Sequence, residues 1–125
     1  MRSASSSDGY TATPEAGVYA AMELLGQRWV LRVVWELEPG PLGFLELRRR
    51  MGNCSSSMLA DRLARLADAG IVEKLPDKSY ELTAHRGMEL GAALEGLWVW
   101  ADKNAATLVA NSRRVEAGEN ARRRD

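Results

Sequence analysis

Residues 41–83 read PLGFLELRRRMGNCSSSMLADRLARLADAGIVEKLPDKSYELT. Apolar residues recur in this segment with the helical period of about 3.6 residues as far as Gly70, and with the strand period of 2 after it. The segment therefore predicts a short helix, a tight turn, a second helix, and two strands joined by a polar turn. This order of elements is typical of a winged helix-turn-helix, whose second helix enters the major groove of DNA.

The second helix of this segment carries the clearest local signals. Ser55 is a favourable N-cap, and Gly70 can adopt the left-handed conformation that closes a helix at about Ala69. Three leucines follow at positions i, i+4 and i+7, which places them on one face of the helix. We therefore expect this face to lie in the core and the serine-led face to be exposed. The three leucines are Leu59, Leu63 and Leu66.

Further helices are predicted before this segment. Pro14 is tolerated in the first turn of a helix, and Gly26 ends that helix. Residues 27–38 form a second helix with a broad apolar stripe, which the prolines at 39 and 41 stop.

After the serine-led helix, residues 71–75 and 80–83 are predicted as strands of a tight hairpin. Thr83 can then cap a last helix. That helix carries more apolar surface than one side of a small domain covers. The predicted fold class is mainly α with a small β-hairpin (α+β), a winged helix-turn-helix with extra N- and C-terminal helices, and the surplus apolar surface of the last helix suggests a partner helix.

The domain organisation follows from the same patterns. Residues 1–13 are rich in serine and threonine and are expected to form a flexible arm. Residues 14–110 form the winged helix-turn-helix domain together with the extra N- and C-terminal helices, to which the family resemblance described below assigns dimerisation. Residues 111–125 are polar and charged, and are expected to be a frayed tail.

Charge and composition narrow the functional classes. The chain has 17 basic and 17 acidic residues, so its net charge neither supports nor excludes nucleic acid as a partner. No apolar run approaches the roughly 18 residues that a membrane span needs, and the first residues lack the apolar segment of a signal peptide. The single cysteine, Cys54, cannot form an internal disulfide. We therefore expect a cytoplasmic protein with no membrane partner.

The serine-led helix supplies the candidate DNA-binding residues. The serines lie where free backbone N–H groups and the helix dipole favour a phosphate. The arginines on the flanks of the helix can reach the DNA backbone or make a bidentate contact to guanine. Basic residues of the preceding helix and of the hairpin are the expected phosphate contacts. The predicted set is Arg48, Arg49, Ser55, Ser56, Ser57, Asp61, Arg62, Arg65, Lys74 and Lys78.

A plainer interpretation of these residues stays open. The serines could only cap the helix, and the arginines could only be solvated surface charges. Asp61 on a groove-facing surface would repel phosphate, although it could accept a hydrogen bond from a cytosine amino group. Asp61 and the zero net charge therefore favour an alternative function, a winged-helix protein-interaction module with lost or weak DNA binding.

Residues 24–74, LLGQRWVLRVVWELEPGPLGFLELRRRMGNCSSSMLADRLARLADAGIVEK, resemble the HxlR-type winged-helix regulators of bacteria. Three motifs carry the resemblance, and their spacing agrees as well as their composition. The resemblance implies a homodimeric transcriptional regulator that binds double-stranded DNA at palindrome-like operators, with the first and last helices forming the dimer interface. The matching residues are Leu25, Gly26 and Trp29; Gly40, Pro41, Phe44, Glu46, Leu47 and Arg48; and Leu59, Arg62, Leu63, Leu66, Gly70, Ile71 and Val72.

The chain departs from the family pattern in three places. Many relatives have a cysteine just before the first helix, which some use to sense oxidants, whereas residues 16–19 here read AGVY. Proline and lysine usually follow the cap serine, but this chain has Ser56 and Ser57. The wing is also shorter than usual. The operator sequence and redox sensing therefore do not carry over.

The four tryptophans leave two hypotheses open. Trp29 and Trp100 occupy positions of the family pattern and are expected to lie in the core. One hypothesis is an apolar pocket between the dimerising helices that takes a small aromatic effector. The alternative is tight packing at a hydrophobic interface. The pocket residues would be Tyr19, Met22, Trp29, Trp35 and Trp98.

Other reactive residues give weak signals. Cys54 lies near a helix N-terminus, which can make a thiol redox-active, or it is simply a small residue in a turn. His85, the one histidine, has no cysteine or carboxylate partners at metal-ligand spacing. No glycine-rich phosphate loop or nucleophile motif is present in the sequence. We therefore expect no enzyme, no catalytic residues, no cofactor and no metal.

Overall fold

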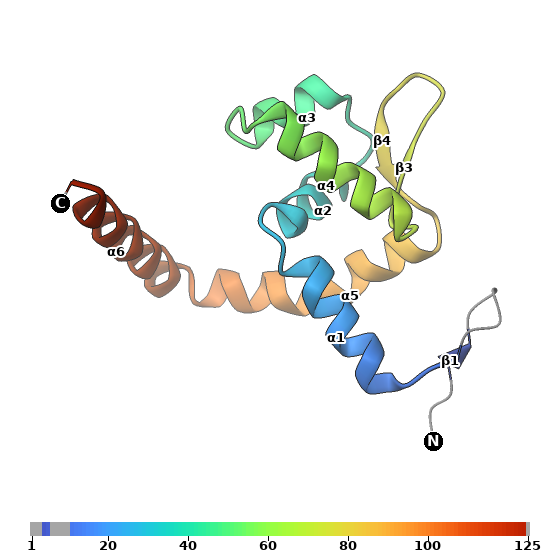
Figure 1. The fold of residues 1–125 in the computed structure, drawn as a ribbon, viewed down its shortest axis with the longest axis horizontal. Coiled ribbons are helices and arrows are strands. Elements are labelled where there is room, and N and C mark those ends of the chain that lie inside the picture. The colour runs from blue at the N-terminus through green and yellow to red at the C-terminus, as the bar shows by residue number, and fades with distance from the viewer. Residues whose placement is uncertain (1–3, 6–10, 125) are drawn as a thin grey trace. The chain divides into compact units, whose positions relative to one another are not determined.

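The computed structural model describes residues 4–5 and 11–124, and its helices and strands are traced in Figure 1. These residues form a mainly helical α+β structure, which confirms the predicted winged helix-turn-helix class. In chain order the elements are β1 (Ala4–Ser5), β2 (Thr11–Ala12), α1 (Pro14–Leu25), α2 (Val30–Leu37), α3 (Phe44–Arg50), α4 (Ser56–Asp68), β3 (Val72–Lys74), β4 (Tyr80–Leu82), α5 (Arg86–Lys103) and α6 (Ala105–Arg124). The chain divides into two compact units, residues 1–91 and residues 92–125.

The core of the first unit is built from one face of each central helix. The buried side of α2 contributes a stripe of valines and a leucine, and α4 contributes three leucines. The predicted inward face of α4 is therefore confirmed, since none of these leucines exposes more than 2% of its surface. The buried apolar residues are Val30, Val33, Val34, Leu37, Leu47, Met51, Leu59, Leu63, Leu66, Ile71, Val72 and Leu82.

The predicted ends of α4 are also confirmed. The Ser55 hydroxyl accepts a hydrogen bond from the Met58 amide at 3.3 Å, as an N-cap residue does. At the other end Gly70 has a φ of +75°, and the Ile71 amide donates to the Leu66 carbonyl at 2.9 Å. This closing bond satisfies a carbonyl that the helix leaves free.

The wing consists of β3, β4 and the turn at residues 75–79. The strands pair antiparallel, with Val72 opposite Leu82. Leu42 adds a third position to this small sheet, because it exchanges two backbone hydrogen bonds with Tyr80, at 3.0 and 2.8 Å. The chain between α2 and α3 is thereby tied to the wing, a contact that the sequence pattern did not predict.

Thr83 joins the wing to α5. Its hydroxyl donates to the Gly70 carbonyl at 2.7 Å and accepts from the Gly87 amide at 2.8 Å, so the predicted capping role is confirmed. Gly87 is buried, and a Cβ placed there would lie 2.3 Å from the Ile71 carbonyl oxygen. A residue without a side chain is therefore required where α5 begins.

Both ends of the chain contain regular secondary structure. The last helix is interrupted at Asn104, whose side-chain amide donates to the Trp100 carbonyl at 2.9 Å. Beyond it α6 continues to Arg124, where a frayed tail was expected from residue 111, because alanine, arginine and glutamate are good helix formers. The expected flexible arm, residues 1–13, lies partly outside the described residues, and its residues 4–5 pair with residues 11–12.

Candidate nucleic-acid interface

The N-terminus of α4 presents three exposed serines. The hydroxyls of Ser55 and Ser57 are 3.0 Å apart and share a hydrogen bond, while Ser56 is the first residue of the helix. Ala60 and Ala64, one and two turns further on, are also exposed. This side of α4 therefore combines small side chains, which allow close approach, with a helix end that favours phosphate.

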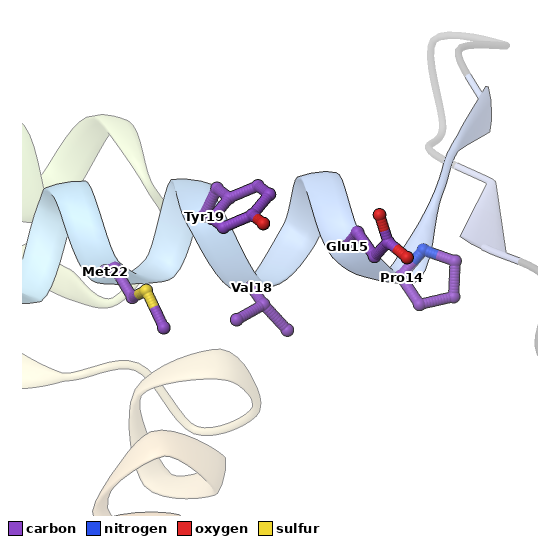
Figure 2. A pocket seen from close by; sticks show the side chains of 5 residues that line it. All are labelled: Pro14, Glu15, Val18, Tyr19 and Met22. Atoms are coloured by element: carbon purple, nitrogen blue, oxygen red, sulfur yellow. The ribbon is translucent and has the colours of Figure 1, made fainter.

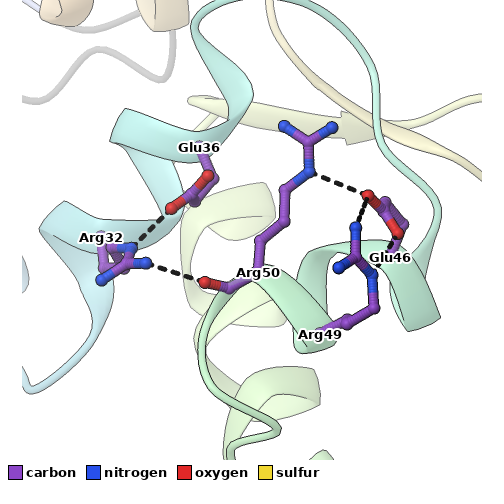
Figure 3. Close-up of polar contacts among 5 residues, drawn as sticks. All are labelled: Arg32, Glu36, Glu46, Arg49 and Arg50. Carbon is purple, nitrogen blue, oxygen red and sulfur yellow. Dashed lines mark hydrogen bonds and ion pairs between the residues drawn. The ribbon is translucent and has the colours of Figure 1, made fainter.

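Two arginines of α3, Arg49 and Arg50, converge on one carboxylate, Glu46 (Figure 3). Arg49 donates to both oxygens of Glu46, at 2.9 and 2.6 Å, and Arg50 donates to one of them at 3.0 Å. The hydrogen bonds from Arg49 and then from Arg50 lower the pKa of Glu46 to about 2. Glu46 therefore stays ionised and cancels one of the two neighbouring positive charges.

Arg48 has a structural contact in addition to its predicted role. Its Nε donates to the Cys54 carbonyl at 2.6 Å, and its side chain is partly buried. The guanidinium therefore bridges the turn that joins α3 to α4. Cys54 itself is half-buried.

Asp61 is held between two arginines of its own helix. Its Oδ2 accepts from Arg65 Nε at 2.9 Å and from Arg62 Nη1 at 2.5 Å. These bonds, that from Arg65 above all, lower the pKa of Asp61. Asp61 therefore orients the guanidinium groups of Arg62 and Arg65.

Arg62 also reaches across the molecule. Its Nε donates to the Arg28 carbonyl at 2.8 Å, in the turn between α1 and α2. Sequence reasoning missed this contact, since a backbone carbonyl 34 residues away leaves no signal in the sequence.

The wing contains Lys74 and Lys78, the two predicted phosphate contacts. It also contains two acidic residues that were not among the predicted site residues. Lys74 Nζ lies 5.7 Å from the centroid of the Tyr80 ring, and exposed Lys78 occupies the turn with a φ of +72°. Glu73 and Glu81 are directly opposite each other in the sheet. Desolvation, followed by the interaction with Glu73, raises the pKa of Glu81. The wing is therefore less basic than its lysines suggest.

The predicted effector-pocket residues lie in different places. Tyr19 and Met22 line a hollow along α1, together with Pro14, Glu15 and Val18 (Figure 2). In Figure 2, Val18 and Met22 project from the same side of the helix. Trp29 lines a second hollow, formed by residues 25–29, 31 and 32. The hollow along α1 therefore brings together two of the five predicted residues, while Trp35 is 48% exposed on α2 and Trp98 belongs to the unit 92–125.

Two tryptophans correct the expectation of a core position. Trp100 is 53% exposed, because the unit 92–125 is made of helix and offers this face little to pack against. Trp29 is half-buried and has the left-handed φ of +78°, which is uncommon for a bulky residue. The Arg28 guanidinium lies 5.4 Å from the centroid of its ring.

Residues 4–5 and 11–124 contain neither a metal-binding cluster nor a membrane span. No group of three or more histidine, cysteine or acidic residues there could hold a metal ion, and His85 is exposed. No helix within the same residues is long and apolar enough to span a bilayer.

Known proteins resemble this chain in sequence and in structure. A family model described as HxlR-like helix-turn-helix matches residues 24–108. The HTH-type transcriptional regulator YodB of Bacillus subtilis is 35% identical over 101 residues, which cover 76% of this chain and 88% of YodB. Its quinone-bound crystal structure aligns with a TM-score of 0.64 at 34% identity, over 74% of this chain and 99% of that one. The reduced form of the redox regulator HypR aligns with a TM-score of 0.64 at 25% identity, over 75% and 98%.

Proposed function

The chain belongs to the HxlR-like helix-turn-helix family of transcriptional regulators, and we propose on this basis that it binds DNA sequence-specifically as a homodimer. Its operator is palindrome-like, with one half-site for each copy of α4. A regulator of this kind works in the cytoplasm, where bacterial DNA lies, and it needs neither a catalytic residue nor a cofactor.

One observation carries the proposal: the leucine face of α4 is buried while its serine-led face is open. Ser55, Ser56 and Ser57 stand at the exposed end of the helix, and Arg65 is 52% exposed on its flank. Phosphate contacts by serine and by backbone N–H groups would fix the register of α4, and side chains further along would touch base edges. Arg49 and the wing residue Lys78 are exposed and add phosphate contacts on either side.

The dimer is supported by apolar surface in each unit. In α1, Val18, Tyr19 and Met22 are exposed, and in the unit 92–125 so are Val99 and Trp100. Apolar surface of this kind marks an interaction site. A second copy is the partner we propose, since the modest charge of one domain calls for two half-sites to reach useful affinity.

Selection from a pool of random DNA tests the proposal and identifies the operator in the same experiment. The chain should enrich a palindrome-like sequence, which it then binds at least about a thousandfold more tightly than a scrambled duplex. Fluorescence anisotropy at physiological salt measures this ratio. Equal affinity for both duplexes would contradict the proposal.

The alternative function is a winged-helix protein-interaction module. It is favoured by the two carboxylates, Glu46 and Asp61, that neutralise part of the basic surface. Such a module would enrich no sequence from the pool and would bind DNA weakly. The same selection therefore separates the two functions.

A small aromatic effector is a further part of the proposal. The hollow along α1, lined by Val18, Tyr19 and Met22, has the apolar character that such a ligand needs, and the related YodB has been crystallised with a quinone. Titration of the Cys54→Ser variant with a benzoquinone separates reversible binding from reaction with the thiol. We expect tryptophan quenching and a shift in operator affinity in this variant too. If both effects require Cys54, the thiol is the redox site and the pocket is not a binding site.

A further inference from the structure

We propose that Arg62 is a positioning residue, which fixes α4 on the turn between α1 and α2 and makes no contact with DNA. The inference rests on the proposed DNA-binding function and assigns a role within it. It differs from the expectation that the basic residues of α4 all face the duplex.

The contacts of Arg62 leave its guanidinium directed inward. Nε donates to the Arg28 carbonyl at 2.8 Å, and Nη1 donates to Asp61 at 2.5 Å. The side chain is 21% exposed, against 52% for Arg65, one turn away on the same helix. Two nitrogens of Arg62 are thus engaged in different directions, whereas Arg65 donates to Asp61 and remains largely in solvent.

The turn that Arg62 contacts is conformationally demanding. Trp29 is the N-cap of α2, has a φ of +78° and makes no side-chain capping bond. Gln27 Oε1 is buried without a hydrogen-bond partner among the described residues. Both features are unfavourable by themselves, so the surrounding contacts must maintain the turn. The Arg62 bond is one of these contacts, and it comes from α4.

The turn also connects directly to α1. The Gly26 amide donates to the Met22 carbonyl at 2.8 Å, so the last turn of α1 runs without a gap into residues 26–29. A displacement of α1, whether by a partner copy or by a ligand in the hollow beside Met22, is therefore transmitted through Arg28 to Arg62 and α4. Arg62 is therefore a direct link between the turn that follows the proposed dimer helix and the DNA-binding helix.

Charge-preserving substitution distinguishes positioning from phosphate contact. Lysine keeps the charge but has one compact nitrogen, so it cannot reproduce the two divergent bonds of Arg62. On a duplex that the wild-type protein selects from random DNA, we expect Arg62→Lys to weaken binding about fivefold or more. The matched control is Arg113→Lys, at an exposed position in α6 beyond the family match, and it should change affinity less than about twofold.

The salt dependence of binding gives a second readout, which loss of structure alone would not reproduce. Each phosphate contact contributes about −0.9 to the slope of log K against log salt. Arg65→Gln should therefore reduce the slope by about one per half-site, while Arg62→Gln should weaken binding with an unchanged slope. Wild-type affinity in Arg62→Lys, or a slope reduced in Arg62→Gln as in Arg65→Gln, would overturn the inference.

Hydrogen exchange of the DNA-free protein tests the same link when no operator is found. Arg62→Lys should speed amide exchange in residues 26–33, and Arg65→Lys should leave it unchanged. Equal exchange in the two variants would overturn the inference. If selection from random DNA fails but the exchange result is as expected, the proposed DNA-binding function is overturned. The role of Arg62 in fixing α4 on the turn is then still supported.

Discussion

At the scale of single residues, two carboxylates set the charge of the helix-turn-helix surface. Glu46 binds two arginines of α3, and Asp61 binds two arginines of α4. Each carboxylate together with its two arginines therefore carries one net positive charge, whereas the two arginines alone would carry two. The modest basicity of this surface therefore has a local cause, which the net charge of the whole chain does not reveal.

Replacing Asp61 should strengthen DNA binding and make it less selective. Asparagine retains an acceptor for the Arg62 bond but removes the charge that holds the Arg65 guanidinium. We expect Asp61→Asn to bind scrambled DNA more tightly, with a salt slope about one unit steeper per half-site. Anisotropy titrations between about 50 and 200 mM salt measure both quantities.

Asp68→Asn is the matched control, since Asp68 lies at the exposed end of the same helix. It removes the same charge and should leave the slope within error of wild type. An equal effect of both substitutions would mean that the overall charge matters and the local ion pairs do not.

Glu46 makes the stability of the fold depend on pH at the acid end. The arginine bonds hold its pKa at about 2, below the ordinary value of 4.5. Its stabilising contribution is therefore complete above about pH 4.5 and is lost as the pH falls towards 2. Glu46→Gln should lose less stability than wild type over this window, as urea unfolding at a series of pH values would measure.

Glu81 provides a control of opposite sign. Its pKa is raised, because desolvation and Glu73 disfavour the charged form, so wild-type stability falls as the pH rises through that pKa. Glu81→Gln should therefore be more stable than wild type at about pH 7, and this difference should disappear at about pH 4. The same pH profile for both variants would contradict the assignment of their charge partners.

At the scale of the elements, the sequence predicts whatever depends on local chemistry. The N-cap at Ser55, the glycine that closes α4 and the leucine face follow from residues close together in the chain, and all three predictions are confirmed. Two contacts join segments that are far apart in the sequence, the pairing of Leu42 with Tyr80 and the Arg62 bond to Arg28. The periodicity of apolar residues could not predict either of them. The exposed position of Trp100 could not be predicted from its apolar character either, because burial depends on what lies opposite the helix.

The start of α5 should be the least tolerant position in the wing region. A methyl group at Gly87 would lie 2.3 Å from the Ile71 carbonyl oxygen and 3.0 Å from the Leu82 Cβ. We expect Gly87→Ala to reduce the free energy of unfolding by about 1–3 kcal/mol through overpacking. The midpoint of urea unfolding measures this loss.

Gly118→Ala is the control for helix propensity alone. No described atom lies within 4 Å of a Cβ at this position in α6. Alanine there should be neutral or stabilise the chain by about 0.5–1 kcal/mol. If Gly87→Ala proved equally harmless, the close packing of α5 against the wing would be wrong.

At the scale of the whole molecule, the proposed DNA binding depends on two copies of the chain. The mass of one chain is 13.8 kDa, and sedimentation should give twice that value for the wild-type protein. The proposed interface is formed by exposed apolar residues of α1 and, from the α5 part of the unit 92–125, by Val99 and Trp100. Two linked copies of α4 can then bind two half-sites about one helical turn of DNA apart.

Trp100→Glu should dissociate the dimer, because it places a charge on the apolar surface of the unit 92–125. We expect a monomer at micromolar concentration and an operator affinity reduced at least about a hundredfold, since the two half-sites no longer bind together. Sedimentation and anisotropy on one preparation test both effects. Val115→Glu, in the part of α6 beyond the family match, should remain a dimer.

Affinity cleavage from α4 would locate this helix on the DNA. An iron-EDTA group attached to Ser57→Cys, in a Cys54→Ser background, should cut the selected operator in two symmetric clusters about 10 base pairs apart, with the offset typical of the major groove. The same group attached to Lys103→Cys, at the end of α5, should give no such pair of clusters. Diffuse cleavage from position 57, or cleavage no stronger than from position 103, would show that the serine-led face of α4 does not lie in the groove.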